Sequence, residues 1–286
     1  MPDRILVSPH ELMELIDGGE CVTVDCRFDL NNTGKGREDW LEGHVPGAFY
    51  AHLDNDLSGR IEPHTGRHPL PDVEAFARFL ASVGWREGKM LVAYDDSSSM
   101  FAVRLWWLMR YYGQAVAILD GGFDAWKEAG MYVDTFPISA LPTHVPELAP
   151  SRSMALSTSR IEDGLGRLTL IDARAAERFS GEVEPLDRRA GHIPGSLNRP
   201  FDLNLAEDGR FKRPETLRAE FQQLISGSAL NNVVHTCGSG VSACHNLFAM
   251  ELAGLNGTRL YPGSWSRWIV NPDRPIETGP RSVNRP

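Results

Sequence analysis

The sequence predicts an α/β protein of two tandem domains, each a mainly parallel sheet flanked by helices. Two observations lead to this prediction. Short apolar runs of strand length alternate with amphipathic runs of helix length in both halves of the chain, which is typical of parallel strands joined by helices. The same motifs also occur twice in the same order, which indicates that one unit has been duplicated.

The repeated motifs form three matched pairs of segments. These are VTVDCRFD (22–29) with LTLIDARAAE (168–177), EGHVPGAFY (42–50) with AGHIPGSLN (190–198), and LDGGFDAW (119–126) with YPGSWSRW (261–268). Three matches in one order are hard to obtain by chance, so we expect each half to be a complete copy. Because both halves keep the arginine of the first pair and the histidine of the second, we assign those residues to structure.

Local signals define individual elements within each half. Ser8 and Glu11 have the spacing of a capping box, with Pro9 as the first helical residue, so a helix is expected to begin there. Apolar runs predict strands at 22–26, 91–95, 168–172 and 232–236. Longer runs predict helices at 100–113 and 242–254, the second of which ends at a glycine.

The boundary between the two halves is marked by composition. Residues 136–153 are rich in proline and serine, as linkers are. We therefore expect an N-terminal domain at 1–138, a linker at 139–153 and a C-terminal domain at 154–286.

Charge and composition exclude several classes of protein. The net charge of −9 and the absence of a basic run argue against nucleic acids and acidic membrane surfaces as partners. The N-terminus lacks the pattern of a secretory signal, and no apolar run is long enough to span a membrane, so we expect a cytoplasmic protein. Four cysteines are too few for a disulfide framework in 286 residues, and we expect them to be reduced.

The loop TCGSGVSA (236–243) places a thiol between a predicted strand and a predicted helix. Cys237 follows a predicted parallel strand and precedes a predicted helix, whose N-terminus carries partial positive charge. Gly238 and Gly240 allow the backbone amides to turn inward, which favours a thiolate. The corresponding position of the first half is Asp95, so we expect one reactive loop, in the second half, and a first half that is silent by itself.

The cysteines allow three other interpretations. Cys237 could be a small core residue, as free cysteines often are, but the flanking glycines favour reactivity. A metal site is not expected, because the nearby histidines and cysteines lack paired ligand spacing. A cysteine phosphatase needs an arginine six residues after the cysteine, where this chain has Ala243.

The repeated Asp-x-Arg, Gly-His-[Val/Ile]-Pro-Gly and Gly-[Gly/Ser]-x-x-x-Trp motifs, with a cysteine in the second loop alone, resemble the two-domain rhodanese sulfurtransferases. The resemblance covers essentially the whole chain and implies two tandem rhodanese-like domains. The loop CGSGVS is most similar to the 3-mercaptopyruvate sulfurtransferase loop CG[ST]GVT, with Ser242 in place of threonine. The thiosulfate sulfurtransferase loop carries arginine and lysine after the cysteine, and this chain does not.

The resemblance implies a reaction with two steps. Sulfane sulfur would pass from 3-mercaptopyruvate to Cys237 as a persulfide, with release of pyruvate, and then to cyanide or a thiol such as a thioredoxin-like protein or a small dithiol. It implies no metal and no organic cofactor. Two alternatives stay open: thiosulfate as the donor, or a persulfide carrier or regulatory module without enzymatic turnover.

The resemblance also implies a set of site residues. Cys237, Ser239, His68 and Asp54 would be catalytic, and Arg178 would bind the donor carboxylate. A second arginine of the family has no clear match, so Arg188 or Arg189 is expected to fill its place. The remaining loop residues expected to contact the donor are Gly238, Gly240, Val241 and Ser242. Since Asp54 and His68 come from the first half, the resemblance implies a site between the halves.

Overall fold

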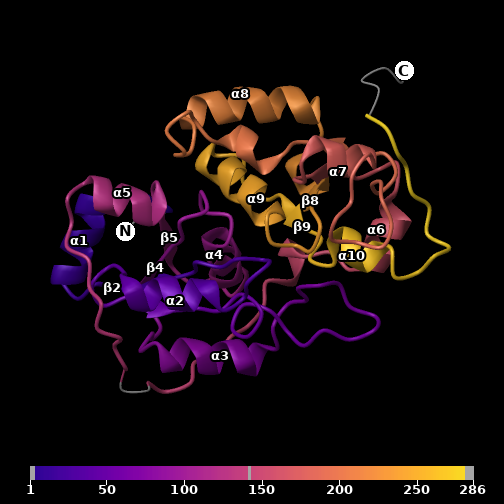
Figure 1. The fold of residues 1–286 in the computed structure, drawn as a ribbon. Coiled ribbons are helices and arrows are strands. Elements are labelled where there is room, and N and C mark those ends of the chain that lie inside the picture. Colours follow the sequence, from indigo (N-terminus) through magenta and orange to yellow (C-terminus); the bar gives the residue numbers. More distant parts are fainter. Residues whose placement is uncertain (1–3, 141–142, 281–286) are drawn as a thin grey trace. The chain divides into compact units, whose positions relative to one another are not determined.

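The structure is a computed structural model that describes residues 4–140 and 143–280 (Figure 1). The chain forms two compact units. Unit 1 comprises Met1–Gly59, Leu70–Ser151 and Glu207–Phe211; unit 2 comprises Arg60–Pro69, Arg152–Ala206 and Lys212–Pro286. Residues 60–69 precede the linker by more than 60 residues, yet they pack with the second unit. The domain boundaries expected from the sequence do not reveal this.

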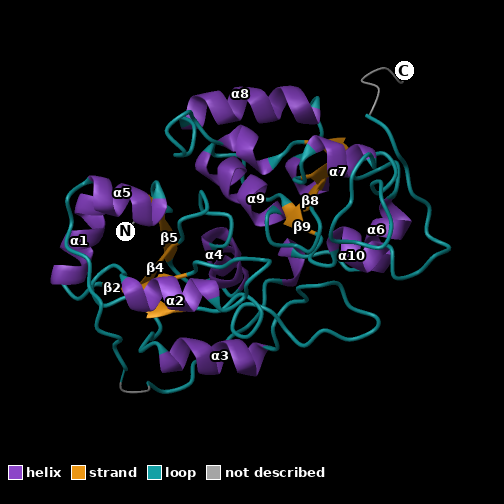
Figure 2. Cartoon of the chain, viewed as in Figure 1, coloured by secondary structure: helices purple, strands orange, loops and turns teal. Residues whose placement is uncertain are grey.

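Unit 1 contains a five-stranded parallel sheet with the strand order β1-β5-β4-β2-β3, of which β5, β4 and β2 are labelled in Figure 2. The strands are β1 (Leu6–Val7), β2 (Cys21–Asp25), β3 (Phe49–Tyr50), β4 (Met90–Tyr94) and β5 (Val116–Leu119). The helices are α1 (Pro9–Asp17), α2 (Lys35–Glu42), α3 (Val73–Ser82), α4 (Ala102–Tyr111) and α5 (Gly122–Glu128). The predicted capping box is present: Ser8 Oγ accepts from the Glu11 amide, and the Glu11 carboxylate accepts from the Ser8 amide.

Unit 2 contains a four-stranded parallel sheet with the order β7-β6-β8-β9. The strands are β6 (Thr169–Asp172), β7 (Leu197–Asn198), β8 (Val233–Thr236) and β9 (Arg259–Leu260). The helices are α6 (Thr158–Gly164), α7 (Ala176–Ser180), α8 (Pro214–Ile225), α9 (Ala243–Leu252) and α10 (Ser264–Trp268), with short 3-10 turns η1 (Arg152–Met154), η2 (Phe201–Asn204) and η3 (Leu230–Asn232). The predicted fold class is confirmed: β2, β3, β4 and β5 correspond to β6, β7, β8 and β9.

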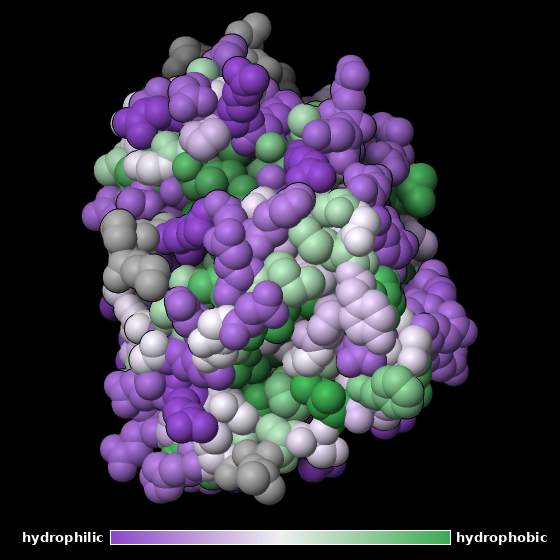
Figure 3. Space-filling view, turned by 90° about the vertical axis from the view of Figure 1, so that its left-hand side faces the viewer, coloured by the Kyte–Doolittle hydropathy of each residue, from purple (hydrophilic) through white to green (hydrophobic). Residues whose placement is uncertain are grey.

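Figure 3 shows the hydropathy of one face of the molecule. Hydrophilic residues cover most of the face drawn in Figure 3, and apolar residues reach it in smaller groups. Within residues 4–140 and 143–280, no helix has the length and hydropathy that crossing a membrane requires.

The Asp-x-Arg motif ties the end of a central strand to a distant loop in each unit. Arg27 donates to both carboxylate oxygens of Asp25 at 2.6–3.1 Å and to the Gly43 carbonyl at 2.6 Å. The same bonds join Arg174, Asp172 and Gly191 in unit 2. A planar guanidinium suits this fork, which fixes the loop against the strand. The repeated motif is therefore structural, as its presence in both halves predicts.

The third repeated motif holds the loop that follows the central strand. In unit 1, the Phe123 amide donates to the Asp95 carbonyl at 2.9 Å. In unit 2, the Trp265 amide donates to the Cys237 carbonyl at 2.9 Å. The two loops are thus anchored in the same way although their first residues differ chemically.

In unit 1, the side chain of Asp95 forms hydrogen bonds to the backbone of its own loop. The buried carboxylate accepts four backbone hydrogen bonds of 2.8 Å, from the amides of Ser97, Ser99, Phe101 and Ala102. These amides are paired by the side chain because the loop geometry offers them no backbone carbonyl. The amides favour the charged carboxylate, but burial outweighs them and raises the pKa of Asp95 to about 6, so the loop holds the charge at neutral pH and loses it in mild acid.

His235 is an unusual core residue of unit 2. It lies on β8, fully buried, and within the described chain neither ring nitrogen has a hydrogen-bond partner. Burial, with a smaller contribution from the positive charge of Arg199, lowers the pKa of His235 to about 3 from its usual 6.5. The folded state therefore keeps this imidazole neutral at pH values where the unfolded chain protonates it.

We expect the Asp95→Ala variant to lose about 2–4 kcal/mol of unfolding free energy, because several buried amides lose their acceptor. Asp96→Ala is the matched control: this neighbouring carboxylate is exposed, and its removal should cost no more than about 0.5 kcal/mol. Chemical denaturation followed by circular dichroism measures both values. Equal stabilities of the two variants would contradict the role assigned to Asp95.

We also expect His235 to make the protein acid-labile. Its folded-state pKa is depressed, so its contribution is intact above about pH 6.5 and is lost as the pH falls towards 3, by about 2 kcal/mol at pH 5. The fall in unfolding free energy between pH 7 and pH 5 should be smaller by this amount in His235→Phe. The exposed His10, replaced by phenylalanine, should leave the wild-type pH dependence intact. Parallel curves for wild type and His235→Phe would refute the assignment.

Candidate active site

Cys237 lies at the carboxyl end of β8, and its side chain is buried in the loop before α9. The Gly240 amide donates a hydrogen bond to Cys237 Sγ at 3.1 Å. The Ser264 hydroxyl lies 4.0 Å from the same sulfur and accepts from the Cys237 amide at 3.1 Å. The sulfur therefore has one close backbone donor, the Gly240 amide, and lies near the Ser264 hydroxyl, which also donates to the Tyr261 carbonyl at 3.0 Å.

Two residues around the sulfur adopt left-handed backbone conformations. Gly240 has φ of +84°, and a Cβ there would lie 2.3 Å from the Pro262 carbonyl oxygen, so no other residue fits. Ser264 has φ of +50°, although it is not glycine. The equivalent residue of unit 1 is Gly122, which also has a positive φ. Strain at Ser264 is consistent with a residue retained for its hydroxyl, a role that no pattern in the sequence indicates.

Ser239 and His68 meet beside the loop. His68 Nδ1 and Ser239 Oγ are 2.7 Å apart, and both side chains are buried. His68 belongs to the segment 60–69 that packs in unit 2, where the Arg67 amide donates to Ser266 Oγ at 3.1 Å. Asp54 lies in unit 1, and its expected role with His68 stays a prediction.

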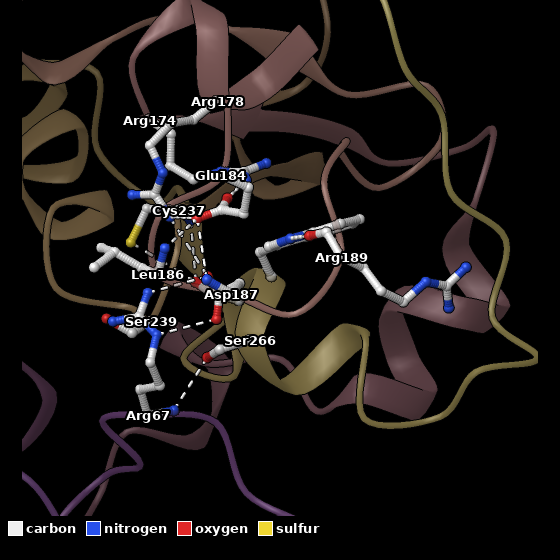
Figure 4. Close-up of polar contacts among 12 residues, drawn as sticks. Arg67, Arg174, Arg178, Glu184, Leu186, Asp187, Arg189, Cys237, Ser239 and Ser266 are labelled. Carbon is white, nitrogen blue, oxygen red and sulfur yellow. Dashed lines mark hydrogen bonds and ion pairs between the residues drawn. The ribbon is translucent and has the colours of Figure 1, made fainter. Parts of the chain in front are cut away.

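Two arginines approach the loop at Gly238. A Cβ at that position would lie 2.7 Å from Arg67 Nη2 and 3.6 Å from Arg178 Nη2, so the glycine leaves space for both guanidinium groups. In Figure 4, Arg178 is drawn above Cys237 and Arg67 below it, in the same half of the view. Arg178 was expected here from the sequence, whereas Arg67 was not.

Buried carboxylates neutralise these arginines. Asp187 accepts from Arg67 Nε and Nη2, both at 3.1 Å, and lies 3.5 Å from Arg178 Nη2. Glu184 pairs with Arg178 at 2.6 Å and with Arg174 at 3.2 Å. The side chains of Asp187 and Glu184 are 4% and 3% exposed, so the pairs are little screened by water. The arginines next to Gly238 are therefore balanced by internal negative charge.

The remaining expected substrate residues lie in different surroundings. The Arg189 side chain points away from Cys237 in Figure 4 and donates to the Pro272 carbonyl at 3.1 Å. Arg188 is exposed. The side-chain atoms nearest to a Cβ at Gly238 belong to Arg67 and Arg178, not to either of these residues. Val241 is buried in the loop, and Ser242 directly precedes α9.

The other cysteines are not placed for reaction. Cys26 is buried, and burial raises its pKa well above the usual value. Cys244 is buried in α9 and donates to the Gly240 carbonyl at 3.4 Å, and Cys21 packs against the core of unit 1. Among the residues that the structure describes, no three His, Cys, Asp or Glu side chains are grouped so that they could hold a metal ion.

The chain is similar to known proteins over nearly its full length. A family model for the rhodanese-like domain matches residues 8–129 and 157–271. A "Probable 3-mercaptopyruvate sulfurtransferase" of Pseudomonas aeruginosa is 43% identical over 98% of this chain and 100% of the relative. The thiosulfate sulfurtransferase of Bos taurus is 32% identical over 93% of this chain and 92% of the relative.

Solved structures agree with the sequence matches. The 3-mercaptopyruvate sulfotransferase SseA of Escherichia coli superposes with a TM-score of 0.79 at 30% identity, covering 91% of this chain and 98% of that chain. The 3-mercaptopyruvate sulfurtransferase of Leishmania major gives a TM-score of 0.82 at 30% identity, covering 93% of this chain and 74% of that chain. The protein therefore belongs to the rhodanese family and is a sulfurtransferase of the 3-mercaptopyruvate or thiosulfate type.

Proposed function

We propose that the enzyme takes sulfur from 3-mercaptopyruvate, holds it as a persulfide on Cys237, and passes it to a thiol or cyanide. One observation carries this proposal: a buried thiol faces amide and hydroxyl donors directly beside two arginines. Such a site can stabilise an anionic sulfur and bind a carboxylate at the same time.

In the first step, the Cys237 thiolate attacks the sulfur of 3-mercaptopyruvate. An S–S bond forms, the C–S bond breaks, and its electron pair goes to the departing pyruvate enolate. The donor's thiol proton is transferred to that enolate carbon, which gives pyruvate and an anionic persulfide. In the second step, an acceptor thiol or cyanide takes the outer sulfur and regenerates the thiolate.

The loop of unit 1 supports the stabilisation of the persulfide. The carboxylate oxygens of Asp95 lie one bond further along the side chain than the sulfur of a cysteine does. Four backbone amides donate hydrogen bonds to these oxygens. A persulfide on Cys237 extends the side chain in the same way. We infer that the outer sulfur gains further amide donors that the unmodified thiol does not reach.

The Ser239 and His68 pair supports the proton transfer. Their contact of 2.7 Å allows the imidazole to polarise the hydroxyl, which then carries the thiol proton towards the enolate. The hydroxyl can also donate to the developing enolate oxygen. We propose that Asp54 assists His68, as the family resemblance implies, and that Val241 and Ser242 line the donor's path.

The charge balance favours 3-mercaptopyruvate over thiosulfate as the donor. Thiosulfate is a dianion, whereas 3-mercaptopyruvate brings a single carboxylate. Arg67 and Arg178 match one carboxylate well, but Asp187 and Glu184 already offset their positive charge. A second negative charge near the sulfur would therefore meet little net attraction.

The acceptor is proposed to be a reduced thiol, either a small dithiol or a thioredoxin-like protein. All four cysteines of the chain are free, which fits a reducing compartment, and we propose the cytoplasm. Turnover of 3-mercaptopyruvate with a small dithiol and no partner protein separates an enzyme from a persulfide carrier.

The Cys237→Ser variant should retain the fold and lose sulfur transfer completely, because a hydroxyl at neutral pH supplies neither the nucleophile nor a persulfide. Intact-mass analysis after treatment with donor should detect one added sulfur on the wild type and none on the variant. Cys244→Ser is the matched control and should still take up sulfur. A sulfur adduct mapped to Cys26 or Cys244 would overturn the assignment.

Arg67→Leu and Arg178→Leu should each weaken transition-state binding of 3-mercaptopyruvate by about 2–4 kcal/mol, because each removes a charge-assisted contact to the carboxylate. The measurement is kcat/KM with a dithiol acceptor. Arg188→Leu and Arg189→Leu serve as controls and should stay close to wild type. A large loss in either control, with none in Arg67→Leu, would return the second binding role to that residue.

Asp187→Asn should shift donor preference towards thiosulfate, since it leaves uncompensated positive charge beside Gly238. We expect the ratio of kcat/KM for thiosulfate to that for 3-mercaptopyruvate to rise about tenfold. Glu182→Gln removes the same charge from an exposed position of the same segment and should not change the ratio. An unchanged ratio in Asp187→Asn would show that charge balance does not set the preference.

A further inference from the structure

A second concave site lies at the end of the unit 2 sheet opposite to Cys237. It is a groove of about 1170 Å³ lined by η1, α6 and the residues that precede β6, β8 and β9. Cys237 follows the carboxyl end of β8, whereas the groove is formed at its amino end, beside Asn232. The two sites are therefore separated by the length of the strand, about 13 Å for four residues.

The groove concentrates positive charge in a protein whose net charge is −9. Most of the charged side chains that line it are arginines, namely Arg152, Arg160, Arg167 and Arg259. Among the described residues that line it, Asp163 is the single acidic one. A positive concavity in an acidic protein favours an anionic ligand over other molecules by long-range attraction.

These arginines lack the acidic partners that several other arginines of unit 2 have. Arg174, Arg199 and Arg274 each pair with a carboxylate at 2.6–2.7 Å. Within residues 4–140 and 143–280, no carboxylate lies within ion-pair distance of the four groove guanidiniums, and Arg167 donates to the backbone carbonyl of Asp163. The guanidinium groups of the groove are therefore available to bind an anion.

Arg259 gives the most specific indication. Its Nε is buried, and no described residue accepts a hydrogen bond from it. Burial also lowers the pKa of Arg259, because no nearby negative charge compensates the loss of water. A buried guanidinium nitrogen without an acceptor is costly unless a ligand or water supplies one.

The other lining groups define the chemistry of the ligand. Asn231, Asn232 and Thr258 add amide and hydroxyl donors, while Met154, Leu156 and Leu168 form apolar walls. None of the described residues that line the groove is aromatic, so the lining offers no ring on which a base could stack. The volume is also too large for one small oxyanion. We propose that this groove binds an oligophosphate, a small molecule with two or three linked phosphate groups, either free or as part of a nucleotide.

Isothermal titration calorimetry of the full chain with sodium tripolyphosphate tests the proposal. We expect one bound ligand per chain, with affinity that falls as salt rises. Arg160→Glu and Arg259→Gln should each weaken binding about tenfold or more, since each removes charge-assisted hydrogen bonds. Circular dichroism and sulfurtransferase activity verify that the variants are folded.

The controls separate the groove from other anion sites. Arg37→Glu, a charge reversal at an exposed arginine of unit 1, and Arg178→Leu, at the proposed donor site, should leave tripolyphosphate binding unchanged. ATP should bind at the same groove with similar affinity, because phosphates carry the recognition. The proposal is overturned if wild type does not bind, if sulfate binds as tightly as tripolyphosphate, if ATP alone binds, or if Arg178→Leu abolishes binding while the groove variants do not.

Discussion

The structure depends on one constraint: the loop after a central parallel strand must hold negative charge with backbone groups. In unit 1 Asp95 supplies the charged group: four amides donate to its carboxylate, which offsets in part the burial that raises its pKa to about 6. In unit 2 we propose that the charge arises during the reaction, first on the Cys237 sulfur and then on its persulfide. The repeated motifs serve this constraint, since the Asp-x-Arg pair fixes the strand end and the first turn of α5 or α10 holds the loop carbonyl.

A second feature of the site is that its positive charges are balanced from within. Burying an arginine without a partner costs several kcal/mol, so Glu184 and Asp187 stabilise the fold around Arg174 and Arg178. The same carboxylates reduce the net positive charge that a bound donor experiences. Stability and donor selection therefore come from one set of ion pairs, and a change in either acid affects both.

Much of the fold could be predicted because the same motifs occur in both halves of the sequence. The duplicated motifs and the periodicity gave the tandem parallel sheets, although the ends of several elements differ by one or two residues, as at α4 (Ala102–Tyr111) and the predicted helix 100–113. The contrast between Asp95 and Cys237 singled out one loop by local chemistry. Ser239, His68 and Arg178 were available only through the family resemblance, since each is unremarkable in its own surroundings.

The remainder could not be predicted because it depends on segments that are distant in sequence. Arg67 and Asp187 are 120 residues apart and meet because residues 60–69 pack in unit 2. Ser264 corresponds to a glycine in unit 1, and its positive φ is a property of the folded loop. The arginine groove is assembled from the amino ends of strands that are separated along the chain.

The most direct measurement of the central claim is a competition between donors. Equal concentrations of 3-mercaptopyruvate and thiosulfate are supplied to the wild-type enzyme with cyanide as acceptor, and pyruvate and sulfite are measured in the same reaction. Because each product reports one donor, their ratio gives the ratio of kcat/KM values. The account predicts that pyruvate forms faster than sulfite and that both products vanish in Cys237→Ser. Faster formation of sulfite would contradict it.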